Sequence, residues 1–228
     1  RDVAVTGVQT CALPIYYLAE LNNLGLELSI SALLANPSEA LLALAARSPD
    51  KSEHRADEPY RRAISGMYAR LAATYQHLIG RKPARPPLGD APEYKTADEL
   101  LADLNTVHRS LKSNGSVTLT RGRLRLLRRA VQVFGFSLAP LDLRQNSDVH
   151  ELVVADLLAA VEPGFEYLKL DESQRVERLL TELQTTRPLY SPHIDYSELS
   201  RGEIAIFQQA EKALALYGVN AVKQCIIS

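Results

Sequence analysis

The chain has 228 residues, of which 46% are hydrophobic, and its formal net charge at pH 7 is −1. This length allows one large domain with a sizeable core, or a piece of a larger protein. The balanced charge provides no global field that would favour nucleic acid or an anionic membrane, and no apolar run reaches membrane-spanning length. The two cysteines, Cys11 and Cys225, form neither a disulfide framework nor a metal-type spacing, which predicts a reducing, cytoplasmic location.

The first fifteen residues differ in character from the rest of the chain. They lack the basic start and long apolar core of a signal peptide. Residues 5–15 correspond to the translated codons of a sequencing adapter, while Arg1 and Asp2 fit its constant bases and residues 3–4 fit a short index. We therefore expect residues 1–15 to be an adapter-derived artefact, native sequence to begin near Tyr16, and the chain to be truncated at both ends.

From residue 16 onward the pattern is mostly helical. Apolar residues at helical spacing, with capping residues at the ends, predict a series of helices. These are expected at residues 16–24, 36–47, 57–79, 96–112, 120–134, 148–160, 171–184 and 197–217. Thr96 with Glu99 forms a capping-box pattern, and Gly25, Gly80 and Gly218 are typical of positions just after a helix. The proline-rich residues 81–94 predict an extended surface loop.

Three short strands are expected between the helices, at residues 26–31, 136–144 and 222–228. Residues 26–31 alternate apolar and polar side chains, which is a strand pattern. Strands separated by helices indicate parallel βα units, in a barrel or an open sheet. We expect an α/β fold that is predominantly helical, namely a partial TIM (β/α)8 barrel with long helical excursions. The barrel would be partial because a complete one needs eight strands and only three are expected here.

Residues 134–150 form the most informative stretch, an apolar run that ends abruptly in Asp142, Arg144, Gln145 and Asn146. In a strand, Leu141 and Leu143 would face one way and the two charged residues the other. A guanidinium on the inner side of a strand end is costly unless an anion meets it, which makes Arg144 a candidate anion ligand. The residues alone equally allow a structural salt bridge to Asp142 or Asp148.

Several motifs together resemble the bacterial type of phosphoenolpyruvate carboxylase. The most specific is Phe134-Gly-Phe followed by Leu141-Asp-Leu-Arg-Gln-Asn-Ser147 and His150. Four shorter segments agree with that family in order and spacing: Leu26-Glu-Leu-Ser-Ile-Ser31, Glu58-Pro-Tyr-Arg61, Arg187-Pro-Leu189 and Cys225-Ile-Ile-Ser228. The resemblance covers residues 16–228, which would be the middle of a protein several times longer.

The resemblance implies a lyase for carbon dioxide fixation that converts phosphoenolpyruvate and bicarbonate to oxaloacetate and phosphate, feeding the tricarboxylic acid cycle. In that family bicarbonate attacks the phosphorus, and the CO₂ released from carboxyphosphate is then attacked by the pyruvate enolate. Anionic species of this kind need arginines and a divalent metal. Arg144 matches the motif arginine of the substrate region and is implied as a catalytic and substrate-binding residue, and Gln145 is implied as a substrate-binding residue.

The same resemblance implies parts that this sequence does not contain. The family's histidine motif, its acidic Mg²⁺ or Mn²⁺ ligands, its lysine and its arginine-rich glycine loop have no counterpart here. We therefore expect no metal site in this chain and no turnover by the chain alone. The resemblance also implies that the full-length protein is a homotetramer. The alternative to an enzyme fragment is a non-catalytic helical interaction module.

Other charged and polar residues receive structural interpretations. The basic cluster Arg121, Arg123, Arg125, Arg128 and Arg129 lacks interleaved aromatic residues, so a solvated or ion-paired helix surface is favoured over nucleic-acid binding. Glu58 and Arg61 are expected to pair locally. His150 is expected to be a hydrogen-bonded residue at a helix start, and Cys225 a small buried strand residue.

Overall fold

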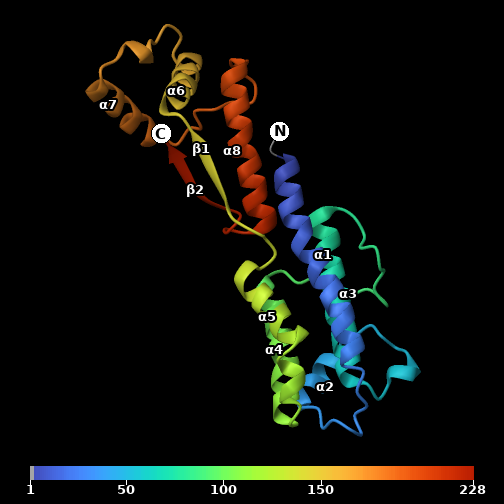
Figure 1. The fold of residues 1–228 in the computed structure, drawn as a ribbon. Coiled ribbons are helices and arrows are strands. Elements are labelled where there is room, and N and C mark those ends of the chain that lie inside the picture. Colours follow the sequence, from blue (N-terminus) through green and yellow to red (C-terminus); the bar gives the residue numbers. More distant parts are fainter. Residues whose placement is uncertain (1–2) are drawn as a thin grey trace. The chain divides into compact units, whose positions relative to one another are not determined.

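The structure is a computed structural model that describes the backbone of residues 3–228 and the side chains from residue 12 onward. Of the expected adapter-derived segment, Arg1 and Asp2 lie outside the described residues. The chain forms two compact units, Arg1–Ala139 and Pro140–Ser228 (Figure 1). Each unit has its own secondary structure and its own contacts. No helix of the described part combines the length and apolarity that crossing a membrane requires.

The regular elements of the first unit, in its described part, are all helices or 3₁₀ turns. Its elements are α1 (Val3–Glu27), α2 (Glu39–Ala46), the 3₁₀ turn η1 (Glu53–Arg55), α3 (Pro59–Ile79), α4 (Ala97–Ser113), the 3₁₀ turn η2 (Val117–Thr120) and α5 (Arg123–Phe134). The expected helices are present, and most of their ends shift by about three residues or fewer. For example, α2 begins after Ser38, whose Oγ accepts a hydrogen bond from the Leu41 amide at 3.3 Å, and not after Asn36. The exception is the helix expected at residues 16–24, which already begins at Val3 and ends at Glu27.

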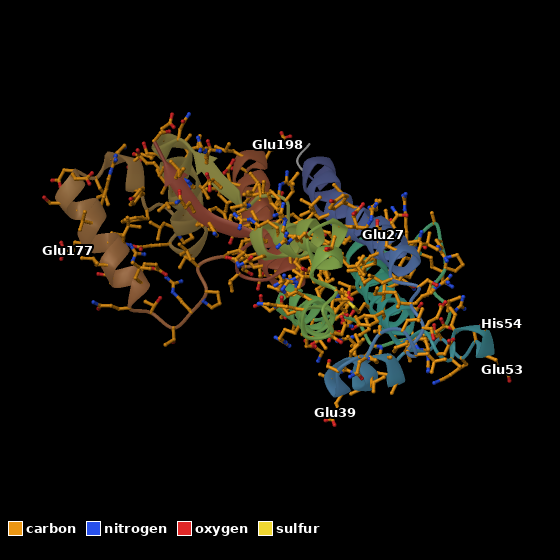
Figure 2. The ribbon with its side chains drawn as sticks, turned by 60° about the horizontal axis from the view of Figure 1, so that its bottom comes forward. Glu27, Glu39, Glu53, His54, Glu177 and Glu198 are labelled. Atoms are coloured by element: carbon orange, nitrogen blue, oxygen red, sulfur yellow. The ribbon has the colours of Figure 1, made fainter. Side chains whose placement is uncertain are left out.

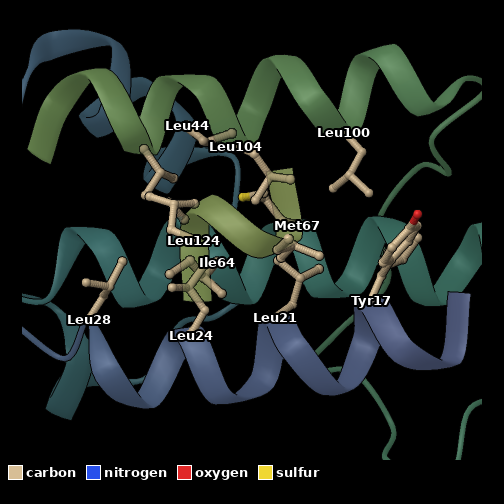
Figure 3. Close-up of a cluster of buried hydrophobic side chains, with 14 of the residues drawn as sticks. Tyr17, Leu21, Leu24, Leu28, Leu44, Ile64, Met67, Leu100, Leu104 and Leu124 are labelled. Atoms are coloured by element: carbon tan, nitrogen blue, oxygen red, sulfur yellow. The ribbon is translucent and has the colours of Figure 1, made fainter. Parts of the chain in front are cut away.

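Leucine-rich faces of these helices meet in one core. Leu21, Leu24 and Leu28 project from α1 and its last turn toward Ile64 and Met67 of α3, as Figure 3 shows. Helices α4 and α5 contribute further fully buried leucines to the same cluster: Leu100, Leu104, Leu111, Leu124 and Leu127. Burying a leucine fully contributes about 1.5–3 kcal/mol, so this cluster is the main source of stability in the first unit.

The strand expected at residues 26–31 is wrong. Helix α1 runs through Gly25 to Glu27, and the residues after it are irregular. Leu24 and Leu28 are both buried four positions apart, whereas Leu26 is 58% exposed, so helical spacing and not alternation decides the burial. Gly25, expected just after the helix, lies inside α1. A Cβ at Gly25 would lie 3.4 Å from Ile64 Cγ2, which shows how closely α1 and α3 approach.

The proline-rich loop of residues 81–94 is confirmed as an irregular segment, and its end is tied to two helices. The Tyr94 amide donates to Thr74 Oγ1 of α3 at 2.8 Å. The Tyr94 hydroxyl donates to Asp103 Oδ2 of α4 at 2.8 Å, and the Arg70 guanidinium lies 3.9 Å from the centre of the Tyr94 ring. Arg70 also pairs with Glu99 at 2.7 Å, so this partly buried network joins α3 to α4.

The second unit contains a pair of parallel strands joined by helices. Its elements are β1 (Leu141–Gln145), α6 (Ser147–Val161), the 3₁₀ turn η3 (Tyr167–Lys169), α7 (Glu172–Leu183), α8 (Glu198–Tyr217) and β2 (Val222–Ile227). Asp171 caps α7 in a complete capping box with Gln174. The strand expected from residue 136 starts only at Leu141, after Pro140, which has no amide hydrogen to donate.

The fold class is therefore mostly helical, with one parallel strand pair in the described residues instead of the three strands expected. The buried apolar residues of the second unit are few: Val153, Leu158, Tyr167, Tyr196 and Ala221. By contrast, Leu183 is 81% exposed and Ile227 is 59% exposed. Cys225, expected to be buried, is exposed as well. A two-stranded sheet with so small a core is marginal by itself.

Candidate functional site at the end of the parallel strands

The polar stretch after β1 lies at the carboxyl end of the strand pair. Gln145 is opposite Ile227 in the register, so both strands end at the same level. The Ser147 amide donates to the Ser228 carbonyl at 2.8 Å, and the Ser228 amide donates to the Gln145 carbonyl at 3.2 Å. This end of the sheet therefore brings Arg144 and its neighbours next to the last residue of the chain.

Arg144 lies on the exposed face of β1. The predicted alternation is confirmed, because Leu141 and Leu143 are half-buried whereas Asp142 and Arg144 are exposed. The Arg144 side chain is 71% exposed, and its Nη2 lies 3.3 Å from Asp142 Oδ2. The argument that this charge is costly because it is buried is therefore wrong for the described chain. The structure shows the local salt bridge to Asp142. Binding of an anion by Arg144 stays a prediction.

Gln145 is held on two sides. Its Nε2 donates to Glu203 Oε1 of α8 at 2.7 Å, and its Oε1 accepts from the Asn146 amide at 2.9 Å. Both polar atoms of the amide are thereby engaged, and its orientation is fixed by a carboxylate that can only accept. A ligand would meet a pre-oriented Gln145 side chain, or would have to replace Glu203.

Glu203 is a residue of this site that sequence reasoning did not identify. It lies in the first half of α8, 58 positions after Gln145 in the sequence. No local pattern links the two residues, since only the return of the chain into the parallel pair brings them together. Ser228 is similar, because its Oγ lies 3.1 Å from Asn146 Oδ1 across 82 positions.

His150 lies in the first turn of α6, close to Phe207 of α8. The two ring centres are 6.2 Å apart. The expected position at a helix start is confirmed, but the expected hydrogen bond is not, because its Nε2 is buried without a hydrogen-bond partner among the described residues. The ring therefore contributes packing between α6 and α8, and nothing positions it against Arg144 as a proton donor.

The described side chains do not fit a divalent metal ion. No group of three or more His, Cys, Asp or Glu residues comes together in this part of the chain. Asp142 faces Arg144, and Glu203 is engaged by Gln145. Among the residues that Figure 2 labels, Glu177 of α7 and Glu198 of α8 lie well apart within the second unit. Hard cations need several converging oxygen ligands, which these residues do not supply.

The basic cluster of α5 is only partly ion-paired. Arg123 contacts Glu20 and Glu27 of α1, both at 2.7 Å, which places it in a structural role. The apolar side chains Leu124, Leu127 and Val131 of the same helix are buried, whereas Phe134 is 42% exposed. At the start of α3, the predicted pair of Glu58 and Arg61 is confirmed at 3.4 Å.

The sequence matches the family described as phosphoenolpyruvate carboxylase over residues 3–228. The chain belongs to the phosphoenolpyruvate carboxylase family. It is 59% identical over 213 residues to a phosphoenolpyruvate carboxylase of Azoarcus sp. (strain BH72), a match that covers 93% of this chain and 23% of that protein. Similar proteins of the same name occur in Bradyrhizobium diazoefficiens (strain USDA 110), at 53% identity, and in Ralstonia nicotianae, at 50%.

The chain thus spans about 23% of the length of these curated phosphoenolpyruvate carboxylases, over 93% of its own. The motif residues Arg144 and Gln145 lie in the second unit, at the polar end of the sheet. The predicted resemblance to this family is confirmed. The roles of Arg144 and Gln145 stay predictions.

Proposed function

We propose that this chain is an internal piece of a phosphoenolpyruvate carboxylase. The parent enzyme would carboxylate phosphoenolpyruvate with bicarbonate, giving oxaloacetate and phosphate, and would supply the tricarboxylic acid cycle from the cytoplasm. The supporting observation is 59% identity over 213 residues to a protein of that name, of which the chain covers 23%. The alternative, a non-catalytic helical interaction module, has no feature that favours it over this relationship.

We propose that Arg144 binds a phosphate or carboxyphosphate group of the reacting species. It lies at the carboxyl end of a parallel strand, the edge at which ligands bind in α/β folds. Its side chain is 71% exposed, and among the described residues its guanidinium contacts only Asp142. Its other N–H groups are therefore open to a ligand. A planar guanidinium can hold two oxygens of a phosphoryl group at once. Gln145, fixed by Glu203, would donate or accept beside it.

We propose further that the parallel pair is part of a TIM barrel. In its support, β1 and β2 are parallel and joined by a helical crossover, the connection from which such barrels are built. Exposed apolar side chains on β2 and α8, such as Ile227 and Phe207, would be covered by the missing strands and helices. The Mg²⁺ or Mn²⁺ of the enzyme would be held by residues outside this chain, and the homotetramer would also need them.

Residues 1–15 keep their proposed adapter origin. The match to an individual carboxylase extends over 213 of the 228 residues, so 15 residues lie outside it. In addition, Pro14 lies inside α1, where a proline is unfavourable because it has no amide hydrogen to donate within the helix. The family match, which starts at residue 3, does not favour this proposal. Resequencing the locus tests it, since native bases that run continuously through codons 1–15 would contradict it.

The experiment for the function compares the full-length protein that carries this chain with the chain alone. Oxaloacetate formation from phosphoenolpyruvate is followed through NADH oxidation by malate dehydrogenase, with and without bicarbonate and Mg²⁺. We expect bicarbonate-dependent turnover by the full-length protein and none by the chain. A folded full-length protein without this activity would overturn the proposed function, and activity of the chain alone would overturn its description as an incomplete piece.

A further inference from the structure

A hollow of about 540 Å³ lies on the first unit, between α4 and α5. This volume is in the range that small-molecule sites occupy. It is lined by Leu101 and Asn105 of α4 and by Arg125, Arg128, Arg129 and Gln132 of α5, and we call it the arginine hollow. The α5 residues are spaced three and four positions apart, so they share one face of the helix. Three guanidinium groups therefore surround a single space.

The charges of the arginine hollow are not neutralised within the described residues. Arg123, on the opposite side of α5, is paired with two carboxylates of α1. Arg125, Arg128 and Arg129 form no salt bridge to any described carboxylate. Three like charges on neighbouring turns repel one another unless an anion lies between them.

Arg128 is held in place within this group. Its Nε donates to Asn105 Oδ1 at 2.8 Å, so the guanidinium is fixed against α4 by a neutral acceptor. Partial burial, followed by the charge of Arg109, lowers the pKa of Arg128. Desolvation and then the charges of Arg128, Lys112 and Arg109 lower the pKa of His108, one turn after Asn105. Among the charges that lower the pKa of His108, that of Arg128 comes from the hollow itself.

We propose that the arginine hollow binds a small polyanion that carries phosphate groups. A phosphate offers three oxygens to several guanidinium forks, and two linked phosphates would span three arginines better than one carboxylate. Gln132 supplies an amide at the rim, and Leu101 provides an apolar wall against which a ligand body can rest. The site belongs to the first unit, and the proposal does not depend on carboxylase activity.

The test is calorimetric titration of the protein with inorganic pyrophosphate at fixed ionic strength. We expect saturable binding that weakens by about tenfold or more in the double variant Arg125→Gln/Arg129→Gln, because two charge-assisted contacts to the anion are lost. The matched control Arg81→Gln/Lys82→Gln removes the same charge from the exposed proline-rich loop and should bind like the wild type. Circular dichroism shows whether each variant keeps its helices. We expect both double variants to keep them, because all four substituted side chains are exposed.

A second measurement locates the ligand. Pyrophosphate in the arginine hollow should raise the pKa of His108, because it offsets the charge of Arg128, and NMR measures this pKa. At the same pyrophosphate concentration the double variant, which binds more weakly, should show a smaller rise. The proposal is overturned if pyrophosphate does not bind, if the double variant binds equally well, or if the His108 pKa is unchanged. Equal binding of citrate would overturn the preference for phosphate, and tighter binding of a random DNA duplex would identify a nucleic-acid surface instead.

Discussion

Arg144 Nη2 lies 3.3 Å from Asp142 Oδ2, on the same face of β1 and two residues apart. Because the Arg144 side chain is 71% exposed, water screens this pair, and such contacts contribute about 0–1 kcal/mol. The pair therefore adds little to stability. A salt bridge this weak could be displaced by a doubly charged phosphate. Without such a ligand, the Arg144 guanidinium lies beside Asp142 near the strand end.

Replacing Arg144 with alanine in the full-length protein tests the proposed role directly. We expect turnover to fall by about 100-fold or more, because a donor aimed at developing charge is lost. The thermal unfolding temperature should stay close to that of the wild type, since the side chain is exposed. Steady-state oxaloacetate formation and circular dichroism measure the two quantities.

Arg201→Ala is the matched control for Arg144→Ala. Arg201 is also an exposed arginine of the second unit, 60% exposed, but it lies on α8 and its salt bridge, at 3.1 Å, is to Asp195 and not to a residue of β1 or β2. We expect it to keep nearly full activity. Near wild-type turnover in Arg144→Ala would dismiss that residue as a ligand, and an equal loss in Arg201→Ala would point to damaged folding.

The Gln145–Glu203 contact predicts a charge-dependent effect. Gln145→Glu would place a second carboxylate where an amide now lies 2.7 Å from Glu203 Oε1. The strand end should loosen by about 1–3 kcal/mol at neutral pH, seen as faster hydrogen exchange of the Ser147 and Ser228 amides. Adding Glu203→Gln should restore slow exchange, because a carboxylate and an amide again face each other. Unchanged exchange in both variants would mean that the contact is not formed in solution.

The core of the first unit predicts contrasting effects for two leucines of α5. Leu124 is fully buried, and its change to alanine should lower the free energy of unfolding by about 2–5 kcal/mol. Leu126, two positions later, is 58% exposed, and its change to alanine should cost no more than about 0.5 kcal/mol. Urea titration followed by circular dichroism gives both values; similar losses would contradict the placement of α5.

Asp50 predicts an acid-dependent part of the stability. Burial alone would raise its pKa, but hydrogen bonds from Arg55 and the Ser52 amide, with the charge of Arg55, together hold the pKa of Asp50 below its ordinary value of 3.8. A carboxyl with a depressed folded-state pKa stabilises the fold above its unfolded pKa, and this contribution is lost as pH falls through the lower folded value.

Asp50→Asn should therefore lower the free energy of unfolding at pH 7. Below about pH 4, where the carboxyl of the unfolded wild type gains its proton, the wild type should lose stability with falling pH more steeply than the variant does. Thermal unfolding temperatures of both proteins across pH 2.5–7 provide the comparison, with about pH 4 as the expected break. Parallel curves for the two proteins would show that Asp50 does not carry this dependence. Glu39→Gln, on the exposed start of α2, is a control that removes a carboxylate without such partners.

The sequence predicted much of the local structure because the signals for it are local. Gly80 ends α3 in the left-handed conformation at φ 71°, and Thr96 Oγ1 accepts a hydrogen bond from the Glu99 amide at the start of α4. Each of these depends on backbone groups within a few residues. The polar end of β1 was visible for the same reason, since strand alternation and the sudden change to Asp142 and Arg144 need no partner to be recognised.

The tertiary structure decided what depends on distant parts of the chain. The alternation of residues 26–31 favoured a strand, but burial of Leu24 and Leu28 against α3 extends α1 instead. Glu203 meets Gln145 only because α8 follows the crossover back to β2. The sequence by itself therefore determined the presence of the helices, some of their caps and the identity of the polar strand end. Which side chains are buried, paired or left exposed was decided by packing between segments far apart in the chain, where hydrophobic burial outweighs local preference.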